Sequence, residues 1–268
     1  IATGLQAQNR LSYGFKAGLN YNTFSGPLDE PESFDRSTGF HIGIIFKKPL
    51  TDIFGLKGEF VYTQRGGEYN YNGPSSFLIQ RETSPILISG TRNMTYNVSN
   101  NYLDFPLIVY GKFGRFEFNT GFNISLLVGS VAAGQLKFTG TNPVVNEFSM
   151  NLDYRFIGDE AREASQFSPQ EIRISNENVS IPSQVGAYYE YDKKDGNQYR
   201  FLDFSYLAGL NFYLNDGLYL GLRGNFGLVD VTRSQMDRTY TTFENNVPVL
   251  RNDKDKQISY QLSLGFSF

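Results

Sequence analysis

The sequence predicts an all-β protein, an eight-stranded antiparallel up-and-down transmembrane β-barrel with long extracellular loops. Three observations lead to this fold class. Apolar and polar residues alternate with a period of two in eight segments, and short and long connections alternate between those segments. In addition, a membrane-spanning helix needs an apolar run of about 18 residues, and no run in this sequence approaches that length. A helical membrane protein is therefore excluded.

The alternation is clearest in the last segment, 258–268, where one face is entirely apolar and the other consists of Ser, Gln and Gly. The apolar face is formed by Ile258, Tyr260, Leu262, Leu264, Phe266 and Phe268. The segment 115–129 repeats this pattern. We expect the other six strands near residues 11–22, 39–48, 55–66, 102–113, 202–214 and 218–231.

The connections between these segments fall into two classes. Those around 49–54, Gly114 and 215–217 are tight, and Asn215-Asp216-Gly217 is typical of a hairpin turn. Those around 25–37, 67–101, 132–198 and 233–256 are long and polar. With eight strands running up and down, every short turn and both termini lie at one end, as in outer-membrane barrels whose short turns are periplasmic.

Alternation does not decide which face points inward, and a soluble lipocalin-like barrel is the competing fold. An eight-stranded barrel is only just wide enough for side chains, so the bulky Phe, Leu and Tyr face is predicted to point outward into lipid. The opposite face carries Gly, Ser and Asn with charges of both signs, Lys47 among them. The expected polar plug of the lumen consists of Lys16, His41, Lys57, Glu59, Asp104, Glu117, Asp203 and Arg223.

Composition excludes several function classes. A formal net charge of −3 gives no basic patch that could follow a phosphate backbone, so no nucleic-acid partner is expected. The chain contains no cysteine, which removes disulfides, thiolate nucleophiles and cysteine-based zinc sites. Residues 1–10 are expected to be a signal-peptide remnant or an N-terminal tail, and residues 11–268 the barrel.

The sequence offers little chemistry for catalysis. His41 is the only histidine and would have to serve as the base of any enzyme, with Glu59 and Thr63 as its expected neighbours. A hydrogen-bonded structural histidine is the favoured interpretation. The lumen carboxylates are interpreted as members of ion pairs rather than acid/base pairs, because an unpaired charge there would be costly. The segment 252–255 lacks the spacing of a calcium loop, and no catalytic residue, metal or cofactor is expected.

The 132–198 connection is the longest and is the expected location of any binding function. Residues 158–164 could form a short helix within it. Tyr188, Tyr189 and Tyr191 are candidate contact residues, since tyrosine clusters are common at protein interfaces. Such a cluster also occurs where a strand simply continues past the membrane.

Several short motifs, in their order along the chain, resemble the PorT-like outer-membrane β-barrel family of Bacteroidota. They are Gly14-Phe-Lys-Ala-Gly-Leu-Asn20, Gly39-Phe-His-Ile-Gly43, Leu56-Lys-Gly-Glu-Phe-Val-Tyr62, Tyr102-Leu-Asp-Phe-Pro-Leu107 and Ala208-Gly-Leu210 with Gly217-Leu-Tyr-Leu-Gly-Leu-Arg223. The resemblance covers about 11–268, although the 132–198 connection is longer than usual for such a barrel. It implies a bacterial outer-membrane location and a final aromatic residue, Phe268, that is read by the barrel-assembly machinery.

Three functions follow as hypotheses. The first is a non-enzymatic structural or interaction barrel, whose partners are outer-membrane lipid, the barrel-assembly machinery and another envelope protein bound through the long loops or the barrel wall. The resemblance implies the specific version, an accessory subunit of a protein secretion or outer-membrane complex. The second is an enzyme that acts on lipid or peptide through a lumen or rim site. The third is a pore, against which a narrow, charged lumen argues.

Overall fold

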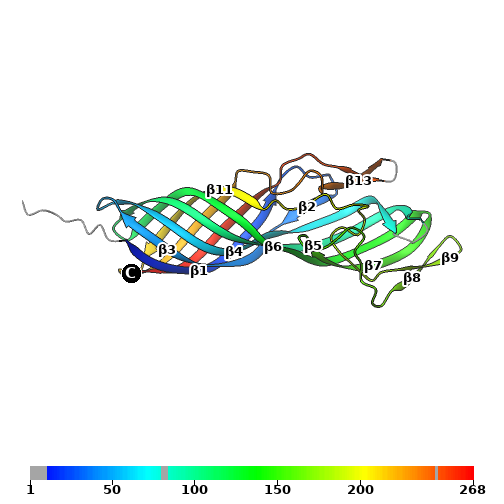
Figure 1. Ribbon diagram of the computed structural model, residues 1–268, viewed down its shortest axis with the longest axis horizontal. Helices are drawn as coiled ribbons and strands as arrows, with labels where there is room; N and C mark the ends of the chain where they lie inside the picture. Colours follow the sequence, from blue (N-terminus) through cyan, green and yellow to red (C-terminus); the bar gives the residue numbers. More distant parts are fainter. Residues whose placement is uncertain (1–10, 80–83, 245–246) are drawn as a thin grey trace, which may run out of the picture.

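The computed structural model describes residues 11–79, 84–244 and 247–268 and confirms the eight-stranded barrel. Eight antiparallel strands form a closed ring, and β1 pairs with β15 along its length to close it (Figure 1). In order around the ring they are β1 (Ser12–Ser25), β3 (Ser37–Pro49), β4 (Phe54–Ile79), β5 (Ile86–Phe113), β6 (Phe116–Asn142), β11 (Leu202–Tyr213), β12 (Leu218–Gly227) and β15 (Lys256–Ser267). The expected tail, residues 1–10, lies outside the described residues.

The three short connections lie where the sequence places them. In the turn between β5 and β6, Gly114 has a φ of +58°, a conformation that residues with a Cβ rarely adopt. In the turn between β11 and β12, Asn215 Oδ1 accepts hydrogen bonds from the backbone N–H groups of Gly217 (3.0 Å) and Leu218 (2.7 Å). The two hydrogen bonds of Asn215 hold the β11–β12 turn in place. No helix among the described residues is long and apolar enough to span a bilayer.

The bulky apolar side chains point out of the barrel, as predicted. In β15 the exposed fractions of Leu262 and Leu264 are 53% and 52%, whereas Ser263 between them is 6% exposed. The same alternation on the other seven strands produces a continuous outward-facing apolar surface, which we call the belt. Its members include Phe15, Leu19, Ile42, Phe60, Leu107, Phe122, Tyr206 and Leu222.

The long connections are not irregular loops, and the expectation for 67–101 and 132–198 is wrong in this respect. Strands β4, β5 and β6 contain 26, 28 and 27 residues, more than twice the about 9–11 that a membrane-spanning strand needs. Beyond the belt they continue as one sheet, which gains β7 (Val144–Arg155) beside β6, the short β10 (Gln184–Val185) beside β7, and β2 (Glu32–Asp35) beside β4. We call this part, with β7 to β10, the extension.

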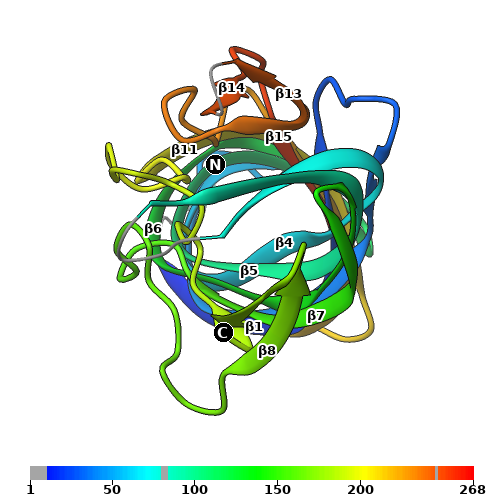
Figure 2. The same ribbon diagram turned by 90° about the vertical axis from the view of Figure 1, so that its right-hand side faces the viewer.

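The extension encloses its own apolar core. Its curved sheet turns round this core, as seen end on in Figure 2. One wall is the hairpin of β8 (Gln170–Ile174) and β9 (Glu177–Ile181), which buries Ile172, Ile174, Val179 and Ile181. A second hairpin, β13 (Arg238–Glu244) and β14 (Val247–Leu250), contributes the buried ring of Tyr240. The extension is therefore a folded unit continuous with the barrel.

The short helix expected at 158–164 is absent, because the backbone of this segment bonds to a neighbouring segment. The N–H of Arg162 donates to the carbonyl of Tyr188 (2.9 Å), and the N–H of Gly186 donates to the carbonyl of Glu163 (3.0 Å). Ala164 pairs with Val185 as an isolated bridge. These cross-segment bonds replace the bonds that a helix would make within itself.

Candidate functional site

Charged side chains fill the lumen in three clusters, and the first is centred on Glu59 of β4. Glu59 Oε2 lies 2.7 Å from Lys16 Nζ on β1, and the Arg223 guanidinium on β12 donates two bonds to the same carboxylate, of 2.6 and 2.8 Å. Lys16 and Glu59 are buried. Because the bidentate arginine fixes the carboxylate plane, this cluster ties three strands together across the lumen.

The second cluster is centred on Glu117 of β6, which is fully buried. Its two carboxylate oxygens accept bonds of 2.5 Å from Lys47 on β3 and Lys57 on β4. The hydroxyl of Tyr213 and the amide of Asn211, both on β11, also donate to it, at 3.0 and 2.9 Å. One carboxylate therefore holds side chains from three other strands, β3, β4 and β11.

The third cluster contains Asp104 and Asp203, which share Arg65. Arg65 Nη1 donates to Asp203 Oδ2 at 3.1 Å, and Arg65 Nη2 bonds to Asp104 and to Ser125. Sequence reasoning did not select Arg65, although it continues the inward-facing alternation of Lys57 and Glu59 along β4. Arg65 lies inside the expected strand 55–66, so this phase was already visible in the sequence.

The side chains of these clusters fill the lumen of the barrel. Each buried carboxylate of the lumen has a cationic partner on a strand other than its own. The opposite charges therefore compensate one another within the low-dielectric interior. Removing one member would leave the other charge buried and unpaired. The ion pairs thus form a plug that connects different strands across the lumen.

Among the described residues, His41 hydrogen-bonds to neither Glu59 nor Thr63, the two neighbours expected from the sequence. Its Nδ1 lies 2.7 Å from Asn20 Oδ1, and its Nε2 lies 2.8 Å from Ser263 Oγ. Thr63 is its register partner on β4, but the Thr63 hydroxyl has no hydrogen-bond partner among the described residues. Sequence reasoning missed Asn20 and Ser263, which lie 21 positions before and 222 positions after His41.

The hydrogen bonds of Asn20 define the tautomer of the histidine. The Asn20 amide nitrogen donates to the carbonyls of Phe40 (2.9 Å) and Gln64 (2.8 Å), so Oδ1 faces the ring as an acceptor. Nδ1 therefore carries the hydrogen, and Nε2 accepts from the Ser263 hydroxyl. A nucleophilic serine requires this order of donors, yet all three side chains are buried, His41 being 1% exposed.

The tyrosines proposed as surface contacts are mostly interior residues. Tyr188 and Tyr189 are buried in the extension core, and the Tyr188 hydroxyl donates to the carbonyl of Phe156 at 2.7 Å. Tyr191 is half-buried and donates to the carbonyl of Met236 at 2.8 Å. The rings of Tyr188 and Tyr189 thus build the core of the extension rather than its surface, which corrects the expectation for these two residues.

The extension also contains a buried charge cluster of its own. Arg92 and Arg238 both donate to Glu190, with distances between 2.8 and 3.0 Å, and the ring of Tyr240 stacks against both guanidinium groups. Burial alone would raise the pKa of Glu190, but the two arginines outweigh it and lower that pKa. The cluster pins the 186–192 segment to β5 and β13.

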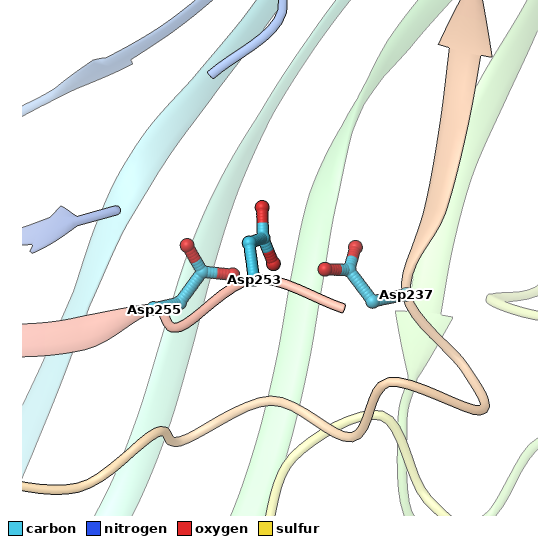
Figure 3. A group of neighbouring side chains, drawn as sticks. All are labelled: Asp237, Asp253 and Asp255. Carbon is cyan, nitrogen blue, oxygen red and sulfur yellow. The ribbon is translucent and has the colours of Figure 1, made fainter. Parts of the chain in front are cut away.

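Three carboxylates gather where β13 begins and β15 approaches. Asp237, Asp253 and Asp255 each place one oxygen within 4.8 Å of the others, and Figure 3 shows Asp253 between its two neighbours. Burial raises the pKa of Asp237 to about 8, and Asp253 and Asp255 act in the same direction against Arg251. Burial also raises the pKa of Asp255 to about 6. At neutral pH the cluster therefore retains a proton.

Comparison with known families identifies the fold family. Residues 6–233 match the family model described as an outer membrane protein beta-barrel domain. The chain belongs to this family. Membership of this family places the protein in the bacterial outer membrane. The belt is accordingly its lipid-facing surface.

Solved outer-membrane barrels are similar to this chain at low identity. Ail, the attachment invasion locus protein of Yersinia pestis, is 11% identical with a TM-score of 0.37, covering 96% of this chain and 99% of Ail. Neisserial surface protein A is 10% identical with a TM-score of 0.35, covering 95% of each chain. OprG from Pseudomonas aeruginosa is 8% identical with a TM-score of 0.33, covering 99% of each chain. A comparison with curated proteins gives no significant match.

Proposed function

We propose that this chain is a non-enzymatic outer-membrane barrel that displays the extension outside the cell as a rigid platform for binding another envelope or surface component. The observation that carries the proposal is the continuity of β4, β5 and β6 through the belt into a sheet with its own core. Continuous strands hold the platform at a fixed orientation. The plugged lumen supports a structural barrel rather than a pore.

The proposed orientation has the short turns and both termini in the periplasm and the extension at the cell surface. The extension exposes apolar side chains that a binding partner could cover. Val144 is 73% exposed and Phe167 is 85% exposed. The resemblance to the PorT-like family of Bacteroidota suggests, as the specific version, an accessory subunit of a secretion or outer-membrane complex. Phe268 would be the residue read by the barrel-assembly machinery.

Cysteine labelling of intact cells tests this orientation, because the chain has no cysteine of its own. A membrane-impermeant maleimide should label Val144→Cys and Phe167→Cys on intact cells. It should label Asp216→Cys, in the β11–β12 turn, only after the outer membrane is permeabilised. The reverse pattern would overturn the orientation, and with it the surface platform.

Crosslinking from the same positions tests the platform role. A photo-crosslinking amino acid at Phe167 should give a defined adduct in native cells, whereas the same group at Asp216 should not give that adduct. Equal adducts at both positions, or none at Phe167 or at Val144, would count against a partner bound to the extension.

The Asn20–His41–Ser263 array supports one alternative, an outer-membrane enzyme acting on lipid or peptide through a lumen site. Its donor order is suitable for nucleophilic catalysis, but the substrate would have to reach a buried Ser263. A fluorophosphonate probe should leave wild-type protein unlabelled if the array is structural. Labelling that disappears in Ser263→Ala, with normal membrane insertion, would establish the enzyme instead.

A further inference from the structure

A groove of about 540 Å³ lies on the outer wall of the barrel, where β11 begins and the chain leaves β12. Its floor is apolar and contains Phe201, Leu202 and Phe204, all of which are exposed. Leu202 and Phe204 alternate with inward-facing Asp203, so their side chains belong to the belt. The floor of the groove is therefore continuous with the lipid-facing surface.

The upper wall of the groove is polar and lies at the edge of the belt. It contains the cations Arg200, Arg233 and Lys254 and the carboxylates Asp230 and Asp253. Ser234 and Asn252 also line it and bond to each other at 3.2 Å. An apolar floor beside a polar wall that has three cations and two carboxylates has the polarity of the region where lipid acyl chains meet their headgroups.

Two of the three cations have no acidic partner among the described residues. Arg200 pairs with Asp230 at 3.1 Å and donates to the carbonyl of Thr232 at 2.7 Å. The side chains of Arg233 and Lys254 make no hydrogen bond or ion pair within the described parts of the chain, and Arg233 Nε is buried without a partner.

Of the two carboxylates that line the groove, only Asp230 has a cationic partner among the described residues. Asp230 accepts bonds from Arg200 and from Thr232. Asp253 is grouped with Asp237 and Asp255 (Figure 3), and it makes no ion pair within the described parts of the chain. The groove thus offers two unpaired cations against a single remaining carboxylate.

We propose that this groove binds a phosphate-bearing lipid of the leaflet on the extension side. The phosphate is held by Arg233 and Lys254, and an acyl chain lies along Phe201 and Phe204. Charge complementarity selects an anionic headgroup, and continuity of the floor with the belt selects a molecule that is already in the bilayer rather than a soluble anion.

Native mass spectrometry of the full chain in detergent tests this proposal, with lipid A as the probe. The double variant Arg233→Gln, Lys254→Gln should bind lipid A at least about tenfold more weakly than wild type, since each cation near the membrane surface contributes appreciably to anionic lipid binding. Lys137→Gln, an exposed cation on the extension, is the matched control and should change binding less than about twofold.

Two further experiments identify the source of the phosphate. Inorganic phosphate should not compete with lipid A at equal concentration. Phe201→Ser should weaken lipid A binding. It should leave unchanged the difference in gel migration between unheated and boiled protein, which reports whether the barrel is folded. Competition by inorganic phosphate would overturn the lipid assignment. Unchanged affinity in the double variant, or equal loss in Lys137→Gln, would overturn the site.

Discussion

The Nε2 atom of His41 lies 2.8 Å from the Oγ atom of Ser263, across the seam where β1 separates β3 from β15. Gly18 of β1 allows this contact, because a Cβ built on Gly18 would lie 2.7 Å from Cε1 of His41 and 1.9 Å from the carbonyl oxygen of Leu262. The only histidine of the chain therefore bridges two strands that are not themselves paired.

His41→Ala should lower the free energy of unfolding by about 1–3 kcal/mol, because it leaves the Asn20 and Ser263 oxygens buried without their partner. His41→Gln, which can replace one of the two bonds, should cost less. The free energy of unfolding of both variants is measured by urea unfolding in detergent. The folded fraction is read from the difference in gel migration between unheated and boiled samples. No measurable destabilisation by His41→Ala would argue against a structural role for the array.

The Glu117 cluster should be more sensitive. Glu117→Gln keeps the shape of the side chain but leaves Lys47 and Lys57 facing each other without a carboxylate, so we expect a loss of about 3–5 kcal/mol. Asp216→Asn, in an exposed turn, is the control and should be neutral. Urea unfolding of the two variants under the same conditions gives the comparison, and a loss below about 1 kcal/mol would show that the cluster is solvated.

The acidic cluster predicts a pH dependence of defined sign. The pKa of Asp237 is raised to about 8 in the folded chain, so its contribution to stability is fully present below its unfolded pKa and is lost as the pH rises towards 8. Each such carboxyl can change stability by at most about 1.4 kcal/mol per pH unit. The melting temperature should therefore fall between pH 5 and pH 8, and Asp237→Asn should reduce this fall. An equal fall in wild type and variant would assign it to other groups.

Strand alternation, turn residues and loop asymmetry were sufficient to predict the barrel, its strand number and its face assignment. The extension was missed because its alternation is built from Tyr against Asn, Glu and Thr rather than from Phe and Leu against Ser. Tyr69 and Tyr71 are buried, and Asn70 and Asn72 point away from the core. A polar, tyrosine-rich segment was therefore interpreted as a loop although its period was two.

The side-chain partners could be predicted only in part. Inward-facing charges follow from strand phase, which located Glu59 and Asp203. Which cation meets which carboxylate depends on barrel stagger and on side-chain length. Arg65, for example, crosses the lumen to Asp203 on a strand 138 positions later in the chain. A single sequence contains no information on such distances.

The last prediction tests the phase of the barrel wall at three consecutive positions of β15. Leu262 and Leu264 belong to the belt, whereas Ser263 faces the lumen and bonds to His41. Leu262→Arg or Leu264→Arg should cost about 2–4 kcal/mol near the bilayer midplane. Stability alone does not separate lipid exposure from burial in a soluble core, so accessibility decides. Labelled single cysteines at 262 and 264 should be quenched by lipid-borne probes, and one at 263 should not. Quenching at 263, or at none of the three, would contradict a lipid-facing belt.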